Sequence, residues 1–406
     1  MDPALPQPVD FATSPVDPAW QLAFTDATVC YAQELFASRM AIPGAPGPRA
    51  SEVLELDFRL EIQHLVNLYV RAHRNKYTLP WSCEAYNAYV GGQDGTKTAF
   101  EDALSVHFPP LESVVEGETG GVIETRPSLI VDKYGVIVLA FLPGVIGHSI
   151  QADAFHSTHL LNPTFELNGP DSSPTWRLAG QTYRRDVDSL YLSPGLATLG
   201  FLHSTGHKTP GKKIHVGRDL GSSGTNLTRS QQDARRWLTR NTKTAALMSA
   251  FSALVSPEQY ALAREGLVRL ARRSDTLREA LESWPFAFTS LAAVSNRSTG
   301  VHRDRKSGGN NFYDVMTTIG GDPDVVQIKF RGIGFSARYT SGSMVAASCH
   351  THLHSVAASP NVERLALAAY MKPTVLLEMG LDMPRLPTIP LVKDLLIRQI
   401  LAHRRI

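Results

Sequence analysis

The sequence has few cysteines, and their arrangement excludes some classes of protein. Its 406 residues include only three: Cys30, Cys83 and Cys349. They form no C-x-x-C pair and no even set that disulfides could join, which excludes a small secreted domain held together by disulfides. We therefore expect an intracellular protein in a reducing compartment.

A long hydrophobic run is also missing. The most apolar stretch, residues 134–146, is too short to span a bilayer and contains Pro143 and Gly144. It predicts a buried strand followed by a turn. Residues 1–10 are proline-rich and acidic rather than basic and apolar, which is unlike a secretory signal. We expect no membrane segment.

The chain has little excess charge, since its formal net charge is +2. A nucleic-acid partner is therefore allowed but not required, and any basic surface has to be local. Basic residues crowd into the stretch 207–243, which holds Lys208, Lys212, Lys213, Arg218, Arg229, Arg235, Arg236, Arg240 and Lys243. Such a density can neutralise the phosphates of double-stranded DNA, whereas the alternative is a solvated helix face with a loop.

Proline and hydrophobic periodicity divide the chain into two parts. Residues 1–50 predict a proline-rich N-terminal arm, and residues 51–406 predict one domain with helical and basic insertions. Apolar spacing predicts helices over 51–74, over 230–254 and from 256 to just before Trp284.

The start of the last helix has its own signature. Ser256 is expected to cap it, with Pro257 as the first helical residue and Gln259 as the partner in a capping box.

Short β-branched and aromatic runs separated by glycine-rich turns predict a sheet structure. The later runs cover 312–319, 325–330, 335–340, 343–348 and 365–371, and the earlier ones cover 121–125, 128–131, 136–142 and 155–161. With the helices, this pattern indicates an α+β fold whose core is a double-stranded β-helix (jelly roll) with flanking helices. Such a core can bring together residues far apart in the sequence.

One histidine has a pattern that occurs nowhere else in the chain. Of the fourteen histidines, only His302 has a carboxylate, Asp304, two positions further on. Two imidazoles and one carboxylate on one face hold iron(II) in oxygenases and leave the other coordination positions open. His350, His352 and His354 lie on one face if their strand is continuous, so alternation does not choose the third ligand. By contrast, we take His148, His156 and His159 as structural or surface residues.

An arginine follows the late histidines. Arg364 begins a predicted strand, and a guanidinium there can hold a carboxylate in a fork of paired hydrogen bonds. The distal carboxylate of 2-oxoglutarate is the natural ligand.

Taken together, these residues resemble the iron(II)- and 2-oxoglutarate-dependent dioxygenases of the TET/JBP family, and most closely its compact fungal and protist forms. The resemblance covers roughly the last third of the chain, with the site in 297–372, and rests on Arg297, His302, Asp304, His354 and Arg364. It implies that His302, Asp304 and His354 hold iron and that Arg364 and Arg297 hold the two carboxylates of 2-oxoglutarate. The spacing to Arg364 selects His354, with His352 as the reserve.

The same resemblance implies a substrate. It implies oxidation of methylated bases in DNA, 5-methylcytosine to 5-hydroxymethylcytosine and further oxidised forms, in the nucleus. Residues 305–307, after the iron aspartate, depart from the better-known members and leave the base preference open, so N6-methyladenine is a second candidate. We expect a monomer.

The strand after Arg364 supplies candidates for the base pocket. Alternation places Ala366, Ala368, Tyr370 and Lys372 on the face of Arg364, with Leu365 and Leu367 on the other. We assign Tyr370 and Lys372 as the catalytic candidates, and the alternative is that these are ordinary core positions.

The same motifs occur in other classes of protein. A dioxygenase of a small molecule or protein side chain could use the same iron site without DNA. A catalytically silent DNA-binding protein is disfavoured by the intact ligand set. The stretch 206–213 has the spacing of a phosphate-binding loop but lacks its Ser or Thr and a following helix, and the triplet 302–304 lacks the remaining kinase motifs.

Overall fold

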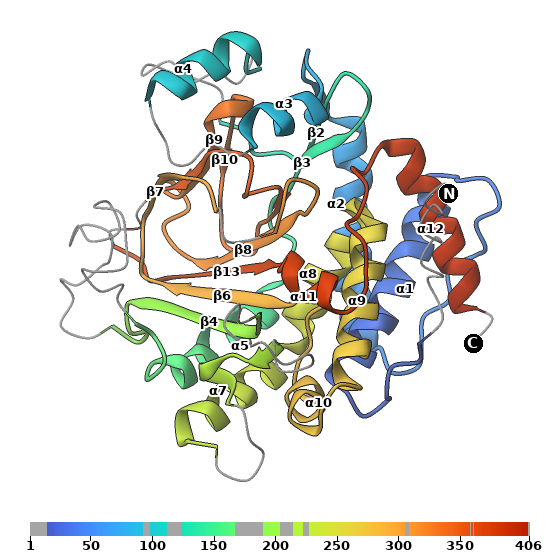
Figure 1. The fold of residues 1–406 in the computed structure, drawn as a ribbon, viewed down its shortest axis with the longest axis vertical. Helices are drawn as coiled ribbons and strands as arrows, with labels where there is room; N and C mark the ends of the chain where they lie inside the picture. Colours follow the sequence, from blue (N-terminus) through green and yellow to red (C-terminus); the bar gives the residue numbers. More distant parts are fainter. Residues whose placement is uncertain are drawn as a thin grey trace, which may run out of the picture.

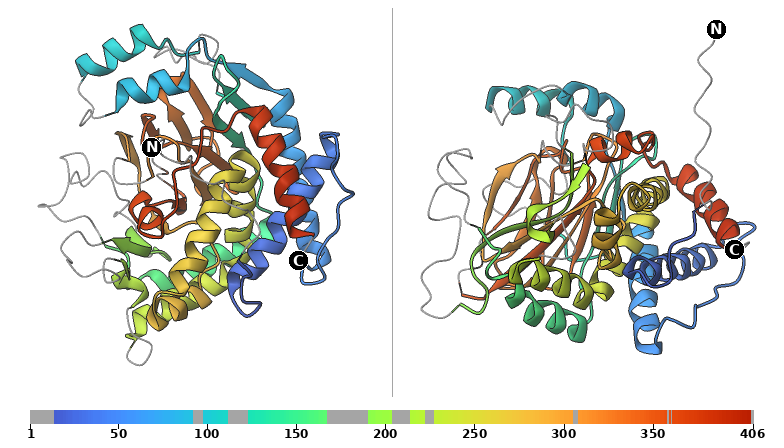
Figure 2. Two further views of the ribbon diagram at one scale, coloured as in Figure 1. Left: turned by 45° about the vertical axis from the view of Figure 1, so that its right-hand side comes forward. Right: turned by 60° about the horizontal axis from the view of Figure 1, so that its bottom comes forward.

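The structure, a computed structural model, describes residues 14–91, 98–111, 123–166, 190–203, 214–221, 227–304, 308–357, 359 and 361–404. Within these ranges the chain is mixed α+β, with a nine-stranded sheet, a four-stranded sheet and eleven α-helices. Most of the helices gather on one side of the large sheet, and the small sheet lies on the other (Figures 1 and 2). The predicted α+β class is therefore confirmed.

The large sheet is antiparallel except for its first pair of strands, β1 and β2. Its order is β1 (Lys76–Thr78), β2 (Ser128–Val131), β3 (Ile137–Leu142), β11 (Met344–Ala347), β8 (Asp314–Gly320), β13 (Arg364–Tyr370), β6 (Ser290–Ser295), β4 (Gly195–His203) and β5 (Ile214–Val216). The small sheet is antiparallel, in the order β10 (Phe335–Arg338), β9 (Gln327–Phe330), β12 (His354–Val356) and β7 (Thr299–His302). From β8 to β13 the chain crosses repeatedly between the two sheets.

A layer of helices covers the outer face of the large sheet. It contains α1 (Gln21–Arg39), α2 (Leu56–Arg74), α5 (His148–Ser157), α7 (Arg229–Arg240), α8 (Thr242–Val255), α9 (Pro257–Ala271), α10 (Asp275–Glu282) and α12 (Ile389–His403). Every residue of α8 except Lys243 is buried, because this helix lies between α1 and the sheet. A helix that is apolar on all sides is stable only in such a position.

Three further helices lie elsewhere. They are α3 (Cys83–Val90), α4 (Thr98–His107) and α11 (Pro373–Glu378), and short 3-10 turns, η2 (Thr158–Leu161), η5 (Arg218–Leu220) and η6 (Arg331–Ile333), complete the described elements. Figure 1 shows α3 and α4 at the end of the molecule near the small sheet. None of the described helices is both long and apolar enough to cross a membrane.

Alternation along the strands separates two hydrophobic cores. Leu365, Leu367 and Ala369 of β13 are buried with the helices, whereas Val345 and Ala347 of β11 are buried between the two sheets. The predicted two-faced character of β13 is thus confirmed. Its other face, which begins with Arg364, faces the small sheet, and that is where the candidate site lies.

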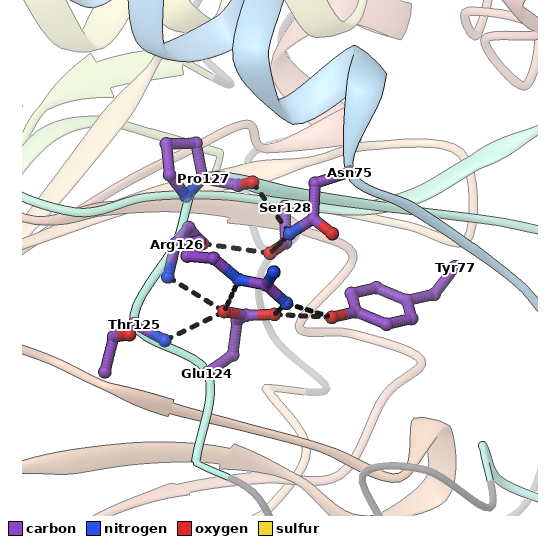
Figure 3. A network of polar contacts seen from close by, with 7 residues as sticks. All are labelled: Asn75, Tyr77, Glu124, Thr125, Arg126, Pro127 and Ser128. Carbon is purple, nitrogen blue, oxygen red and sulfur yellow. Dashed lines mark hydrogen bonds and ion pairs between the residues drawn. The ribbon is translucent and has the colours of Figure 1, made fainter.

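A polar network fastens the edge of the large sheet to the small one (Figure 3). The buried carboxylate of Glu124 accepts hydrogen bonds from the Tyr77 hydroxyl and from the backbone and side chain of Arg126. The backbone of Glu124 pairs with β10, donating to Ser336 and accepting from Arg338. Burial alone would raise the pKa of Glu124, but these hydrogen bonds outweigh it and lower the pKa to about 2.

The structure corrects two predictions for the first half of the chain. The predicted strand 155–161 is helical, formed by α5 and η2, because Ile150, Ala154 and Leu161 recur at helical rather than alternating spacing on the buried side. The range assigned to a proline-rich arm, 1–50, contains the helix α1, which packs against α8; its first thirteen residues lie outside the described ranges.

Both long predicted helices of the insertion are divided. The helix over 230–254 breaks at Asn241, whose amide donates to Ser157 and to the backbone of Trp237. The helix from 256 ends at Ala271, and α10 restarts after Ser274, which caps it by accepting from the backbone of Leu277.

The predicted capping box at Ser256 is wrong. The Ser256 side chain makes no capping hydrogen bond, and the Gln259 amide bonds to both backbone groups of Tyr313 instead. Because the Gln259 side chain is buried against Tyr313, just before β8, it does not reach the backbone at the start of the helix.

Candidate metal centre

The two strands at the edge of the small sheet bring the first and last candidate ligands together. His302 ends β7, His354 begins β12, and the two residues pair directly opposite each other in antiparallel register. Directly opposite residues have their side chains on the same face of a sheet. The imidazole rings accordingly lie with their centroids 4.2 Å apart.

Asp304 completes a three-residue cluster. Its Oδ1 lies 3.3 Å from Nε2 of His302, and its Oδ2 lies 3.4 Å from Nε2 of His354. One donor atom from each residue falls within 4.8 Å of the others, which is the spacing of atoms that share one ion. Both imidazoles are buried, but the Asp304 side chain keeps 36% of its surface exposed, so one side of the cluster is open.

Backbone carbonyls fix the orientation of both imidazoles. Nδ1 of His302 lies 2.9 Å from the carbonyl of Gly300, and Nδ1 of His354 lies 3.1 Å from the carbonyl of His352. A carbonyl only accepts, so each Nδ1 carries a proton, and each Nε2 faces Asp304 and becomes a ligand atom once it is deprotonated. This arrangement, in which the second ring nitrogen is fixed by a hydrogen bond, is typical of histidines that bind metals.

The charges of the cluster also suit a cation. Burial would raise the pKa of Asp304, but hydrogen bonds and charge from the two histidines outweigh it, and the pKa lies well below its usual value. Burial and the neighbouring His354 lower the pKa of His302. Burial opposes protonation of His354 as well, but the Asp304 carboxylate outweighs it and raises that pKa. An ionised carboxylate and a neutral imidazole are the forms that bind metal, and binding at His354 would release a proton.

The other late histidines do not join the cluster. Residues 348–353 form turns rather than a continuous strand, so the alternation expected for His350, His352 and His354 does not hold. The His352 ring stacks on Tyr86 at 5.0 Å, and burial lowers its pKa to about 3. His352, the reserve candidate, therefore supports His354 through its carbonyl and is not placed as a ligand.

Two residues that the sequence did not single out as ligands lie beside Asp304. Cys349 and Asp314 form a second group of possible ligand atoms with it, again within 4.8 Å of one another. The Cys349 carbonyl accepts a hydrogen bond from the Asp304 backbone, 2.9 Å away, and burial raises the pKa of the Cys349 thiol. In the sequence, nothing distinguishes Asp314 from any other acidic residue at the start of a strand.

Arg364 lies buried at the start of β13, between the two sheets. Its Nε donates to Oγ1 of Thr318 at 2.9 Å, its Nη1 donates to the carbonyl of Arg297 at 3.1 Å, and the guanidinium lies over the ring of Tyr339. No carboxylate of the described residues forms an ion pair with it, and burial lowers its pKa to about 10. A buried cation without an anionic partner is costly, which suits a site that binds an anion.

The remaining predicted site residues lie on neighbouring elements. Arg297 follows β6, is buried, and touches Arg364 through its carbonyl. Tyr370, at the end of β13, pairs with Ser290 of β6, and burial together with the charge of Asp314 raises its pKa to about 12. Lys372 precedes α11, and partial burial lowers its pKa.

The described part of the basic stretch 207–243 lies away from this centre. Helix α7 packs on α5, η2 and η5 on the helical side of the large sheet, opposite β7 and β12 (Figure 1). Most of its described cations form ion pairs with acidic side chains of the same chain, mainly at the surface: Arg218 with Glu166 and Asp219, Arg229 and Arg236 with Asp233, Arg235 with Glu279, and Lys243 with Glu55. Lys208, Lys212 and Lys213 lie outside the described residues, as do positions 305–307.

His302, Asp304 and His354 form a cluster of two imidazoles and one carboxylate that could hold a metal ion, the donor set of a 2-His-1-carboxylate site. No protein-family model and no curated protein matches the chain. Among solved structures, the chain is similar to NgTET1 in complex with 5mC DNA, at 14% identity and a TM-score of 0.41, over 72% of this chain and 92% of the other. Similarity at this level assigns neither a family nor an activity.

Proposed function

We propose that the chain is an Fe(II)- and 2-oxoglutarate-dependent dioxygenase that oxidises methylated bases in DNA. The observation that carries the proposal is the His302–Asp304–His354 cluster together with Arg364, a buried guanidinium that donates to the carbonyl of Arg297, just before the strand that ends in His302, and has no carboxylate partner among the described residues. A ligand set with open positions and a nearby anion anchor are together what an iron enzyme with a keto-acid cosubstrate needs.

The donor set fits iron(II). Two imidazole nitrogens and one carboxylate oxygen occupy one side of the ion and leave the opposite side for exchangeable ligands. Thiolate ligands would favour softer metals, but the Cys349 thiol is buried with a raised pKa, which favours its neutral form. When bound, iron and 2-oxoglutarate together supply the oxidising power drawn from dioxygen.

The residues of the chain have three tasks in this scheme. The carbonyls of Gly300 and His352 hold the imidazoles in the ligating tautomer. Arg364, itself held by Thr318 and the Arg297 carbonyl, binds the distal carboxylate of the cosubstrate and so fixes its orientation. We propose that the Arg297 guanidinium contacts the inner carboxylate.

We propose that the substrate base binds against the inner face of β13 and β6 in the large sheet. Ala366, Ala368 and Tyr370 of β13 are only half-buried, as are Ala292 and Val294 opposite them on β6. In this proposal the small side chains of Ala366, Ala368 and Ala292 leave room for a flat base, and Tyr370 and Lys372 close the far end of the pocket. The target base leaves the duplex, because a methyl group within the stack cannot approach a buried metal.

The strand order supports the finer assignment of the fold. The chain passes from β8 in the large sheet to β9 and β10 in the small one, back to β11, then to β12 and again to β13. We propose that these strands form a distorted double-stranded β-helix, with the metal at its open end. A DNA substrate would place the enzyme in the nucleus, where we propose that it acts as a monomer.

One observation favours a different substrate. The described cations of the basic stretch are largely paired with acidic side chains and lie on the helical side of the large sheet. A dioxygenase that oxidises a small molecule or a protein side chain would need no basic surface. The same site chemistry serves both candidates, so the substrate distinguishes them.

The test uses the purified full chain with Fe(II), 2-oxoglutarate and duplexes carrying either 5-methylcytosine or N6-methyladenine. Mass spectrometry of the nucleosides should detect 5-hydroxymethylcytosine and further oxidised forms, or loss of N6-methyladenine, with matching succinate. His302→Ala is the control and should give neither product. If wild-type protein forms succinate with another substrate but leaves both modified bases intact, the DNA substrate is refuted and the alternative stands.

A further inference from the structure

Arg303, the residue between the two ligands of the H-x-D segment, is itself buried. Its side chain is 2% exposed, although an arginine in such a loop would ordinarily reach solvent. The guanidinium forms a two-pronged ion pair with Glu101 of α4, in which Nη1 contacts Oε1 and Nη2 lies 2.9 Å from Oε2. Such a fork fixes the plane of the guanidinium as well as its position.

The same guanidinium also contacts the segment that precedes His354. Nε of Arg303 donates to the carbonyl of Thr351 at 2.7 Å, in the turn that leads to His354. The Asp304 backbone donates to the carbonyl of Cys349 in that same turn, at 2.9 Å. The segment carrying two ligands is therefore fastened at two points to the turn that supplies the third.

Helix α4 is the anchor of this arrangement. It stands at the outer end of the small sheet, beside η6 (Figures 1 and 2). The ring of Phe100, also on α4, lies 5.9 Å from the Arg303 guanidinium. Without Glu101 the buried guanidinium would be left as an unpaired charge, so the ion pair holds Arg303 in place and, through it, the two neighbouring candidate ligands.

We propose that Glu101 and Arg303 are positioning residues for the metal centre and that α4 forms part of its support. The inference rests on the proposed metal site. It assigns a role to a carboxylate that is distant from the H-x-D segment in sequence and is not itself a ligand. The loss of such a support typically weakens metal binding by about 10- to 100-fold.

The experiment measures Co(II) binding to the full chain by calorimetry and by the visible spectrum of the bound ion. Glu101→Gln, which keeps the shape but removes the charge, should weaken Co(II) binding by about 10-fold or more and alter the spectrum. Glu101→Asp, which keeps the charge on a shorter side chain, should lie between Glu101→Gln and wild type. If Glu101→Gln does not fold, Glu101→Asp carries the test alone, and an unchanged spectrum and affinity would overturn the proposal.

A matched control separates positioning from general stability. Asp26 and Arg264 form another buried ion pair, 2.7 Å long, between α1 and α9. Asp26→Asn should lower the melting temperature yet leave Co(II) affinity and spectrum unchanged. Equal weakening of Co(II) binding by Asp26→Asn and Glu101→Gln would refute the positioning role. If wild type and His302→Ala bind Co(II) equally, the metal site itself is wrong, which is a different outcome.

Discussion

His302 and His354 lie directly opposite each other on neighbouring strands, although they are far apart in the sequence. Each donates its Nδ1 proton to a backbone carbonyl, and each turns its Nε2 toward the carboxylate of Asp304. Pairing of β7 with β12 therefore brings the candidate ligands together, and any change that shifts this register would separate the imidazoles.

Replacing a ligand should abolish metal binding. Supporting residues around a metal usually contribute about 10- to 100-fold in affinity, so His302→Ala, Asp304→Ala and His354→Ala should each weaken Co(II) binding by more than about 100-fold. Oxidation of the substrate should fall with it, while the circular dichroism spectrum and DNA affinity stay close to wild type. His352→Phe, which keeps a ring against Tyr86, is the control and should retain binding. Metal binding retained by any of the three alanine variants would remove that residue from the ligand set.

Arg364→Ala should raise the requirement for 2-oxoglutarate. Removing one partner of a buried charge pair costs about 2–5 kcal/mol, which corresponds to an increase of at least about 30-fold in the dissociation constant. Arg364→Lys should recover part of the loss, because a lysine keeps the charge but not the fork. Calorimetric titration of the Co(II)-loaded protein with 2-oxoglutarate measures both. An unchanged dissociation constant in Arg364→Ala would mean that the cosubstrate is anchored elsewhere.

Gly321 supports Arg364 by leaving space for it. A Cβ at position 321 would lie 3.2 Å from Cδ of Arg364 and 3.1 Å from Cγ2 of Val326, at a φ of +85°. Gly321→Ala should therefore raise the dissociation constant for 2-oxoglutarate as well as lower stability. Gly44→Ala is matched in backbone strain, with a φ of +78° and nothing within 4 Å of the added Cβ. It should cost about 1–2 kcal/mol of stability and leave 2-oxoglutarate binding intact. Equal binding by both variants would contradict the packing role.

Tyr370 and Lys372 should govern the substrate rather than the cosubstrate. Lys372→Ala and Tyr370→Phe each remove one polar group from the proposed far end of the base floor, so KM for methylated DNA should rise by about tenfold. The dissociation constant for 2-oxoglutarate should stay unchanged. Leu377→Ala, an exposed position on the adjacent α11, is the control. An effect of the two variants on 2-oxoglutarate binding alone would remove both residues from the substrate pocket.

Glu124 should make stability depend on pH. Its folded-state pKa of about 2 lies below its ordinary value of 4.5, so its ionised form stabilises the fold above pH 4.5, and this contribution is lost as the pH falls toward 2. Glu124→Gln should lower the free energy of unfolding by about 2 kcal/mol at pH 7. Urea unfolding at pH 7 and pH 3.5 should show a smaller difference between the two proteins at the lower pH. The same difference in stability at both pH values would mean that the hydrogen bonds in Figure 3 do not depend on the charge of Glu124.

Local pattern was sufficient for some of the strands, among them β2, β3, β8 and β13, and for one face of the site. Alternation along β13 predicts that Arg364 and Leu365 lie on opposite faces, and they do. It was insufficient for 155–161, where a short apolar run is compatible with helix or strand, and only packing against the large sheet decides between them. The breaks at Asn241 and Ser274 likewise depend on side-chain hydrogen bonds that no periodicity contains.

The sequence by itself determined which metal-binding and anion-binding groups the chain contains. Residue type and spacing are enough to identify a histidine two positions before an aspartate and an arginine at the start of a predicted strand. Alternation alone left three late histidines open and the family resemblance selected His354; the tertiary structure shows that His354 lies beside that histidine and that aspartate. Because residues 348–353 form turns, the His352 ring lies against Tyr86. Strand pairing places His354 opposite His302. The tertiary structure also brings Glu101 into contact with Arg303. Contacts between distant segments depend on how strands pair and helices pack, and spacing along the chain carries no record of them.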